Sequence, residues 1–290
     1  MLHSTNMEIR NLAYTDFDTL FRGFENAFCD YAIHFSKEEV RSMLTRRGFA
    51  PELSFAAFDK DEIVAFTLNG IGEFRGVATA YDTGTGTVKE YRGRGLAGEI
   101  FNKSLPALKK AGIKQYLLEV LKDNHKAINI YRKMNFETTR EFDCFRQDIT
   151  LIKNQNSTGA DIPVSIRIID SSTVIRALAF RDFEPSWQNS SESIKRGYAG
   201  LTGLGAFTND TLVGYCVLDP QSGDIAQIAV SKEYRRMSIG SQLLRQAVTL
   251  MNTDFVKVLN VSADYQPLHH FLSHHNIDLS SRQFEMILPL

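Results

Sequence analysis

Residues 83–97 read Thr-Gly-Thr-Gly-Thr-Val-Lys-Glu-Tyr-Arg-Gly-Arg-Gly-Leu-Ala, a glycine-rich, basic segment that leads into an apolar periodic stretch. This periodicity predicts a helix from about residue 94 to 111. The N–H groups of a first helical turn lack intrahelical partners, and the helix dipole favours negative charge there. Gly93 and Gly95 would let a diphosphate approach the backbone closely. The segment therefore predicts an anion-binding turn at the start of a helix.

The local charge supports this prediction. Residues 89–110 contain six lysines and arginines but only two glutamates, whereas the whole chain has 33 basic and 34 acidic residues and a formal charge of −1. A merely well-capped surface helix would leave the paired glycines unexplained. Proteins that coat nucleic acid need a surplus of cations over the whole domain, so we expect no nucleic-acid partner.

The spacing Gly93-x-Gly95-x-x-Gly98, with Glu119 further on, also matches the dinucleotide-binding fingerprint. That fingerprint requires a buried, almost wholly apolar parallel strand that leads directly to the first glycine. The residues before Gly93 are instead polar and charged, and a long series of predicted strands and helices comes first. A dinucleotide-binding oxidoreductase is therefore the less favoured alternative.

The chain also repeats itself. Lys-Glu-Tyr-Arg at 89–92 recurs at 232–235, 143 residues later, and each copy precedes a small-residue turn and an apolar helix. Leu-Glu-Val-Leu-Lys-Asp-Asn at 118–124 has a weaker counterpart in Leu-Asn-Val-Ser-Ala-Asp-Tyr at 259–265. Matches in the same order and at similar spacing indicate a duplication.

We expect an N-terminal domain at 1–150 and a C-terminal domain at 164–290, joined by a polar linker at 151–163 with its boundary near residue 155. In the first copy, antiparallel strands are followed by alternating strands and helices. This order predicts an α/β fold with a mixed, mostly antiparallel sheet flanked by helices. The predicted strands cover 8–12, 53–58, 62–69, 76–88, 115–121 and 137–148, and the helices cover 15–29, 37–47, 94–111 and 125–134.

Helix-start signals occur in both copies. Ser36 and Glu39 have capping-box spacing, and Asn189 and Glu192 repeat that spacing in the second copy. Pro106 lies inside the third predicted helix and should kink it.

The composition is that of a globular protein: 43% of the 290 residues are hydrophobic and 23% are charged. Cys29, Cys144 and Cys216 are spread singly and predict reduced thiols, not a disulfide framework or a zinc site. No carboxylate or cysteine completes a ligand set at metal-motif spacing around the histidine candidates, so we expect no metal; these candidates are His125, His269, His270, His274 and His275. Without an apolar leader or a long apolar run, we expect a cytoplasmic protein with no membrane partner.

Arg92-x-x-Gly95-x-Ala97 resembles the signature of the GNAT superfamily of acyl-coenzyme A-dependent N-acyltransferases, which is Arg/Gln-x-x-Gly-x-Gly/Ala after the fourth strand. The resemblance continues through residues 118–136, whose Leu-Glu-Val…Asn…Ala…Tyr-x-x-x-Asn-Phe pattern is similar to that of the N-terminal acetyltransferases of ribosomal proteins. Asn135 replaces the usual glycine, and asparagine also tolerates the left-handed conformation of a helix cap. Lys89 replaces a common proline.

The resemblance implies a tandem N-acetyltransferase that moves an acetyl group from acetyl-coenzyme A (acetyl-CoA) to a small-molecule or peptide amine. It gives Tyr131 the role of general acid and Glu119 that of a possible base, with Asp82 as the rival base. The alternative for Tyr131 is a structural role, since aromatic residues on such a helix face usually pack in a core. Asn124 would cap the next helix whether or not it also contacts the carrier. The residues implied to contact the carrier are Thr87, Val88, Arg92, Gly93, Arg94, Gly95, Leu96, Ala97 and Asn124.

The second copy departs from this pattern. Ser238 stands where the first copy has Gly95, Leu272 where it has Tyr131, and Asn260 where it has Glu119. We therefore expect the C-terminal copy to be degenerate. A catalytically silent acyl-CoA-binding or interaction protein remains the alternative for the whole chain. The role of the loop around Trp187 and the oligomeric state stay open.

Overall fold

The structure, a computed structural model, describes residues 7–30, 35–152, 162 and 164–290. The domain boundary expected near residue 155 falls outside this described part. The chain divides into two compact units. The first contains residues up to Glu119, Arg132–Glu137 and Met286–Leu290, and the second contains Val120–Tyr131 and Thr138–Glu285.

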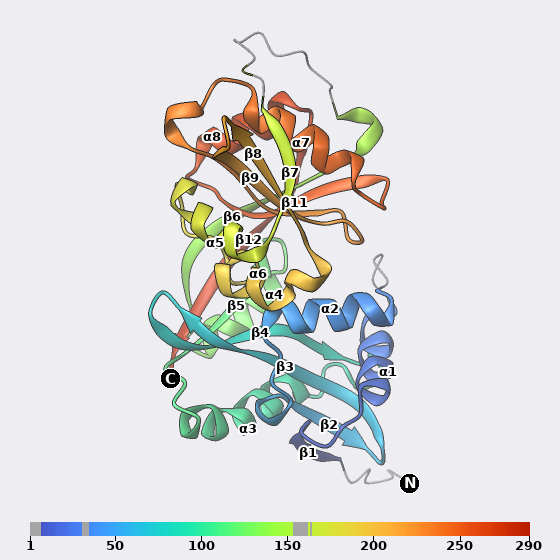
Figure 1. The fold of residues 1–290 in the computed structure, drawn as a ribbon. Coiled ribbons are helices and arrows are strands. Elements are labelled where there is room, and N and C mark those ends of the chain that lie inside the picture. The colour runs from blue at the N-terminus through green and yellow to red at the C-terminus, as the bar shows by residue number, and fades with distance from the viewer. Residues whose placement is uncertain (1–6, 31–34, 153–161, 163) are drawn as a thin grey trace. The chain divides into compact units, whose positions relative to one another are not determined.

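The sheet of the first unit has the order β1-β2-β3-β4-β5, followed by the end of β12 (Figure 1). Strands β1 to β4 are antiparallel neighbours, whereas β4 and β5 are parallel. The predicted mixed sheet is thus confirmed. Its strands are β1 (Glu8–Asn11), β2 (Phe55–Asp59), β3 (Glu62–Phe74), β4 (Val77–Thr87) and β5 (Gln115–Leu121).

Helices cover both faces of this sheet, because neighbouring residues of a strand point to opposite sides. Leu20 of α1 (Phe17–Phe28) and Leu44 of α2 (Lys37–Arg47) pack in one core with Phe66. Ile100 of α3 (Leu96–Lys110) packs in a different core with Ala65. Figure 1 shows α3 on the side of the sheet opposite α1 and α2.

The second unit repeats this plan, with the strand order β12-β6-β11-β10-β9-β8-β7. Strands β7 to β10 are antiparallel and β10 pairs with β11 in parallel. The strands are β6 (Glu137–Asp148), β7 (Ser165–Ile169), β8 (Thr202–Thr208), β9 (Thr211–Asp219), β10 (Asp224–Val230), β11 (Phe255–Ser262) and β12 (Asp278–Pro289).

The helices of the second unit also lie on two faces. Leu243 of α7 and Leu272 of α8 share a core with Cys216, whereas Val174 of α5 and Ile194 of α6 share another with Tyr215. The two cores therefore flank opposite faces of β9. The helices are α4 (His125–Lys133), α5 (Ser171–Arg176), α6 (Ser191–Gly197), α7 (Ile239–Thr249) and α8 (Gln266–His274).

The two copies have exchanged their last strands. Strand β6 comes from the first copy but pairs with β11 of the second, for example at Phe145 and Val258. In return, Met286–Leu290 at the end of β12 belong to the first unit, where the Leu290 N–H donates to the Lys114 carbonyl at 2.8 Å. Each unit thus contains a strand segment from the other copy.

A buried ion pair connects β6 with β12 inside the second unit. The Glu285 carboxylate, which is fully buried, accepts hydrogen bonds from the Arg140 guanidinium and from the Thr139 hydroxyl. The same guanidinium donates to the backbone carbonyls of Glu184 and Pro185. Arg140 therefore joins the exchanged strands to the 184–185 loop.

The predicted helix starts and the proline inside α3 have different outcomes. The capping box of Ser36 and Glu39 is confirmed. The prediction for Asn189 is wrong, because Ser190 is the N-cap of α6 and accepts from the Ser193 N–H. Helix α3 continues through Pro106 to Lys110.

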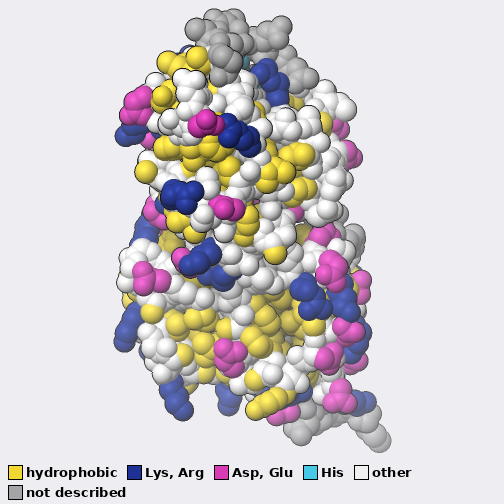
Figure 2. Space-filling view, in the orientation of Figure 1, with side chains coloured by type: hydrophobic (Ala, Val, Ile, Leu, Met, Phe, Trp, Pro, Cys, Tyr) yellow, Lys and Arg dark blue, Asp and Glu magenta, His cyan; other side chains and the backbone are white. Residues whose placement is uncertain are grey.

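Figure 2 shows basic and acidic side chains interspersed on the face in view, so the charges on this face give no field of a single sign. In the described ranges, no helix combines the length and the apolar character needed to cross a bilayer.

Candidate functional site

The glycine-rich turn of the first unit has a conformation that glycine adopts readily. Gly93 and Gly95 have φ values of 79° and 82°, in the left-handed region that favours glycine, and α3 begins directly afterwards at Leu96. A Cβ atom on either glycine would meet no other atom within 4 Å. The side chain of Leu96 is buried in the core, so only its backbone can contribute to this turn. The turn thus presents open backbone at a helix start.

Arg92 fixes the turn against the end of α1. Its Nε donates to the Thr87 carbonyl at 3.0 Å, its Nη2 to the Ala27 carbonyl at 2.9 Å, and its Nη1 contacts the Asp30 carboxylate at 2.8 Å. The hydrogen bond from Arg92 holds the pKa of Asp30 below its usual range. Arg92 is therefore engaged in positioning the turn.

The neighbouring candidates are also engaged locally. The Arg94 Nη2 donates to the Glu90 carbonyl at 2.9 Å, and the Val88 N–H donates to the Val64 carbonyl at 2.9 Å. The first hydrogen bond lies within the turn, and the second joins the residue before the turn to β3. Ala97 lies half-buried in the first turn of α3.

Strands β4 and β5 separate just before the turn. They pair from Thr79 to Tyr81, and a register irregularity follows at the Leu68–Asn69 step of the facing strand β3. Asp82 is the first residue of β4 beyond the paired positions, and Glu119 lies two residues beyond Leu117, the last paired residue of β5. Two carboxylates therefore follow the point where the parallel strands part.

The two carboxylates have different surroundings. The Tyr81 hydroxyl donates to Glu119 Oε2 at 3.0 Å, and burial together with the Glu119 charge raises the pKa of Tyr81 well above its usual value. Asp82 accepts from the Gly84 N–H and the Thr85 hydroxyl, each at 2.9 Å. Burial raises the pKa of Asp82 to about 6, although these hydrogen bonds and the nearby Arg47 charge act in the opposite direction. A carboxylate with this pKa is ionised at neutral pH and is a stronger base than usual.

The remaining candidates, Asn124 and Tyr131, belong to the second unit, whereas the turn and Glu119 belong to the first. Asn124 Oδ1 accepts from the Ala127 N–H at 3.1 Å and so caps α4. Tyr131 is half-buried on α4.

Two substitutions distinguish a helix-capping role of Asn124 from a ligand-binding role. Asn124→Ala should lower the free energy of unfolding by about 1 kcal/mol, because the Ala127 N–H loses its acceptor. Asn124→Ser keeps an N-cap oxygen and should restore most of this loss. Chemical denaturation of both variants provides the measurement. Equal stability of Asn124→Ala and the parent protein would contradict the capping role.

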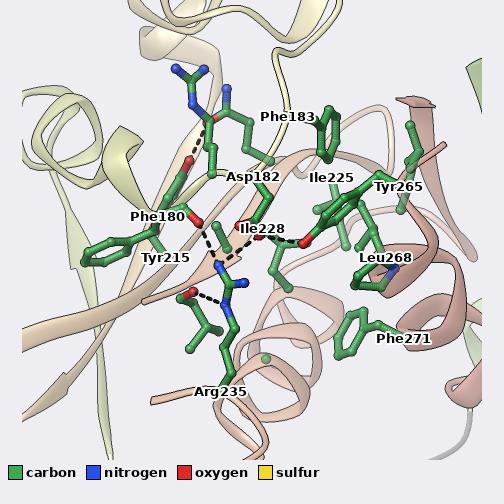
Figure 3. A pocket seen from close by; sticks show the side chains of 18 of the residues that line it. Phe180, Asp182, Phe183, Tyr215, Ile225, Ile228, Arg235, Tyr265, Leu268 and Phe271 are labelled. Atoms are coloured by element: carbon green, nitrogen blue, oxygen red, sulfur yellow. Dashed lines mark hydrogen bonds and ion pairs between the residues drawn. The ribbon is translucent and has the colours of Figure 1, made fainter. Parts of the chain in front are cut away.

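A cavity of about 910 Å³ lies inside the second unit (Figure 3). Its walls come from β10, β11, the start of α7, α8 and the 180–185 loop. The turn before α7 repeats that of the first unit, with Arg236 and Ser238 at φ values of 63° and 61°. The side chains labelled in Figure 3 are Phe180, Asp182, Phe183, Tyr215, Ile225, Ile228, Arg235, Tyr265, Leu268 and Phe271.

Arg235 makes the same set of contacts as Arg92. Its Nε donates to the Val230 carbonyl at 3.0 Å, and its Nη2 contacts the Phe180 carbonyl at 3.2 Å and the Asp182 carboxylate at 2.8 Å. The Tyr265 hydroxyl donates to the same carboxylate (Figure 3). Burial alone would raise the pKa of Asp182, but the hydrogen bonds from Tyr265 and Arg235 outweigh it and lower the pKa.

Neutral amides and one phenol lie at the β10 and β11 side of this cavity. The Tyr215 hydroxyl donates to Gln227 Oε1 at 2.8 Å, and Gln227 Nε2 donates to the Asn189 carbonyl at 2.6 Å. Asn260 Nδ2 donates to the Ser186 hydroxyl at 3.3 Å. Trp187 is buried, with the Arg196 guanidinium 5.6 Å from its ring centroid, so it serves as a packing residue.

Sequence reasoning missed this cavity, because its lining is spread over residues 180–274. The repeated Lys-Glu-Tyr-Arg was the one signal in the sequence that pointed to the turn before α7, which borders the cavity. Within the described residues, no three His, Cys, Asp or Glu side chains form a group that could hold a metal ion.

Comparisons with known proteins agree with this architecture. The profile of the "Acetyltransferase (GNAT) family" matches residues 18–136 and again 173–275. The solved structure of a tandem GNAT protein from the clavulanic acid biosynthesis pathway has a TM-score of 0.72 at 13% identity, with 98% of each chain covered. At this identity the likeness concerns the fold alone.

Two curated relatives match part of the chain. The N-alpha-acetyltransferase MAK3 of Arabidopsis thaliana is 31% identical over 101 residues, which are 34% of this chain and 53% of that protein. The N-alpha-acetyltransferase 30 of Schizosaccharomyces pombe is 33% identical over 87 residues, which are 30% of this chain and 58% of that protein. The chain thus spans little more than half the length of each of these relatives.

Proposed function

The chain belongs to the acetyltransferase (GNAT) family, and from this premise we propose that it transfers an acetyl group from acetyl-CoA to a primary amine by direct attack. The transfer chemistry is assigned to residues of the first copy. The thioester supplies an activated acetyl group. The protein must bind the diphosphate of the coenzyme A carrier, remove a proton from the amine and return a proton to the departing sulfur. No metal is required for these steps.

The observation that carries this proposal is the turn at Gly93 and Gly95. Its backbone is open, because a side-chain atom at either glycine would contact nothing within 4 Å. It also precedes the first turn of a 15-residue helix, whose unpaired N–H groups and dipole favour an anion. Arg92 fixes the turn through three contacts, so the site is arranged in advance of binding. A diphosphate fits these features.

Proton transfer is assigned to residues near the separation of β4 and β5 and to α4. We assign the base to Asp82 or Glu119, and the raised pKa of Asp82 favours Asp82. Glu119 Oε2 already accepts a hydrogen bond from the Tyr81 hydroxyl. Tyr131 is the proposed general acid that protonates the departing thiolate.

The proposed acceptor is the α-amino group of a peptide or protein, because the two curated relatives are N-alpha-acetyltransferases. An α-amine has a pKa of roughly 8, so a useful fraction is uncharged near neutral pH. A small amine is the second candidate.

An acceptor screen tests the function. The full chain should release free thiol from acetyl-CoA when a suitable peptide or small amine is present. Tyr131→Phe should reduce kcat by on the order of a hundredfold, since it removes only the acidic hydroxyl. Unchanged turnover would remove the acid role from Tyr131. Binding of acetyl-CoA without thiol release across a broad amine panel would favour the silent carrier-binding alternative.

A further inference from the structure

Arg47, the last residue of α2, contacts the strand that carries the preferred base, yet the transfer chemistry assigned above gives it no role. We propose that Arg47 is a positioning residue, which fixes an irregular segment of β4 at Thr83 and thereby sets the orientation and the electrostatic surroundings of the Asp82 carboxylate. This inference rests on the proposed function, in which Asp82 is the preferred base. The three residues all belong to the first unit.

Strand β4 contains one residue without a partner on β3. Gly84 of β4 pairs with Leu68 of β3, and Asp82 pairs with Asn69. Thr83, which lies between these pairs, is therefore an extra residue of the kind found in a β-bulge. Its hydroxyl donates to the Leu68 carbonyl at 3.0 Å. Because a bulge changes the direction of the side chains beside it, the direction of Asp82 depends on how Thr83 is held.

The end of α2 is docked directly on β3 beside this bulge. The Gly48 carbonyl accepts from the Ile71 N–H at 2.9 Å, and Phe49 forms an isolated bridge with Gly70. A Cβ atom on Gly70 would lie 2.1 Å from the Arg47 carbonyl oxygen, so a glycine is needed there for the helix end to approach so closely. These backbone contacts hold Arg47 in a fixed place over the sheet.

The side chain of Arg47 joins α2 to the bulge in β4. Its Nη1 donates to the Thr83 carbonyl at 2.9 Å. A bulge leaves the extra residue outside the regular ladder of the strands, and Arg47 supplies a partner for the carbonyl of that residue. Arg47 is half-buried and Thr83 is buried, and a charged donor makes a stronger hydrogen bond than a neutral one. Arg47 therefore stabilises the bulge.

The Asp82 carboxylate is bound on both sides of Thr83 in the sequence. It belongs to the residue before Thr83, and it accepts from the Gly84 N–H and the Thr85 hydroxyl, which follow. Both hydrogen bonds are 2.9 Å long and both span Thr83, so a displacement of Thr83 would change them together. The contact of Arg47 with Thr83 is thus transmitted to the base.

The charge of Arg47 acts on the same carboxylate. Burial raises the pKa of Asp82 to about 6, and the Arg47 charge opposes this rise together with the two hydrogen bonds. The other titratable groups at this place are Tyr81 of β4 and Glu119 of β5, which share a hydrogen bond. Burial and the Glu119 charge raise the pKa of Tyr81 well above its usual value, and the Arg47 charge opposes that rise as well. Arg47 thus favours the ionised form of Asp82.

Carbon-13 NMR of the Asp82 carboxyl group tests this role and needs no turnover. The full chain is labelled at its aspartate carboxyl carbons and titrated with acid, and Asp82→Asn identifies the Asp82 signal by removing it. The parent protein should titrate near pH 6. Arg47→Met removes the charge and the hydrogen bond at similar length, so the Asp82 midpoint should move to higher pH, because a nearby cation favours the ionised carboxylate.

Three further variants make the result specific. Arg47→Lys keeps the charge and should titrate near the parent midpoint. Arg47→Gln lacks the charge but keeps a donor for Thr83, so it replaces Arg47→Met if that variant does not fold, and its midpoint should also rise. Arg41→Met is the matched control, because Arg41 lies on the exposed side of α2 near Glu38, and it should leave the midpoint unchanged. A parent-like midpoint in the two neutral variants at 47, or an equal shift in Arg41→Met, would overturn the proposal.

Thiol release separates this inference from the proposed function. In Arg47→Met the rise of kcat/KM with pH should move with the NMR midpoint, and its plateau should fall by roughly tenfold to a hundredfold, since a displaced catalytic group loses about this much. Arg47→Lys should recover most of the plateau. If the NMR midpoint moves but the pH dependence of kcat/KM does not, Asp82 is not the base, and the positioning of Asp82 by Arg47 stands. If no acceptor gives turnover, the proposed function fails and the NMR titration still decides the role of Arg47.

Discussion

Replacing Glu285 by glutamine should lower the free energy of unfolding of the second unit by about 3–5 kcal/mol. Glu285 is fully buried, and its carboxylate balances the charge of Arg140, whose side chain is only 13% exposed. Glutamine is nearly the same size but neutral, so a buried guanidinium would lose its counter-charge. The loss should also loosen the 184–185 loop, which Arg140 holds through two carbonyl groups.

Denaturant unfolding, followed by a probe in the second unit such as Trp187 fluorescence, measures this change. Glu141→Gln is the matched control, because the ion pair of Glu141 with Lys122 at 2.8 Å is much more exposed, with side chains 50% and 32% exposed. Breaking that pair should cost less than about 1 kcal/mol. A double variant with leucine at 140 and 285 should recover much of the stability, since no unpaired charge remains. If Glu285→Gln lost as little stability as Glu141→Gln, the importance of the Arg140–Glu285 pair would be contradicted.

Asp82→Asn should reduce kcat/KM by about a hundredfold to ten-thousandfold if Asp82 is the base. Asparagine is of similar size: its Oδ1 can accept from the Gly84 N–H and its Nδ2 can donate to the Thr85 hydroxyl oxygen, so the strand should be preserved. Glu119→Gln is the matched variant and should have a smaller effect. The reverse order of the two effects would assign the base to Glu119.

The pH dependence gives a second measure of the same residue. A base must be ionised to act, so kcat/KM should rise with pH through about 6, the raised pKa of Asp82, and level off above it. The acceptor amine adds its own rise near pH 8, which should move when the acceptor is changed. The rise in kcat/KM near pH 6 should stay at the same pH when the acceptor is changed. It should be lost from the residual activity of Asp82→Asn.

Much of the first copy could be predicted from its sequence because the signals are local. The glycine pair at 93 and 95 permits left-handed backbone without steric cost, and the structure has it at both residues. The helices at 17–28 and 37–47 follow from apolar periodicity and from the cap at Ser36. Helix α3 begins two residues later than predicted, because the left-handed Gly95 cannot belong to it.

The remaining features depend on contacts between distant residues. The pattern of 137–148 predicts a strand, but nothing within it shows that its partner is β11 rather than a strand of its own copy. Ser238 in place of Gly95 led us to expect a degenerate second copy, yet Arg236 and Ser238 keep the left-handed turn beside the contacts of Arg235. The raised pKa of Asp82 likewise depends on burial, and the hydrogen bond from Tyr81 to Glu119 joins two strands, neither of which the sequence reports.

The exchange of terminal strands has a consequence for biosynthesis. A ribosome delivers residues 1–119 early, yet the unit that they form also includes Met286–Leu290, which emerge after the entire second copy. Chains with independent domains can fold each one as it is translated. The first unit, as the structure has it, is complete only once residues 286–290 have been synthesised. Recombination that moved either copy alone into another gene would separate it from the strand segment that the other copy supplies.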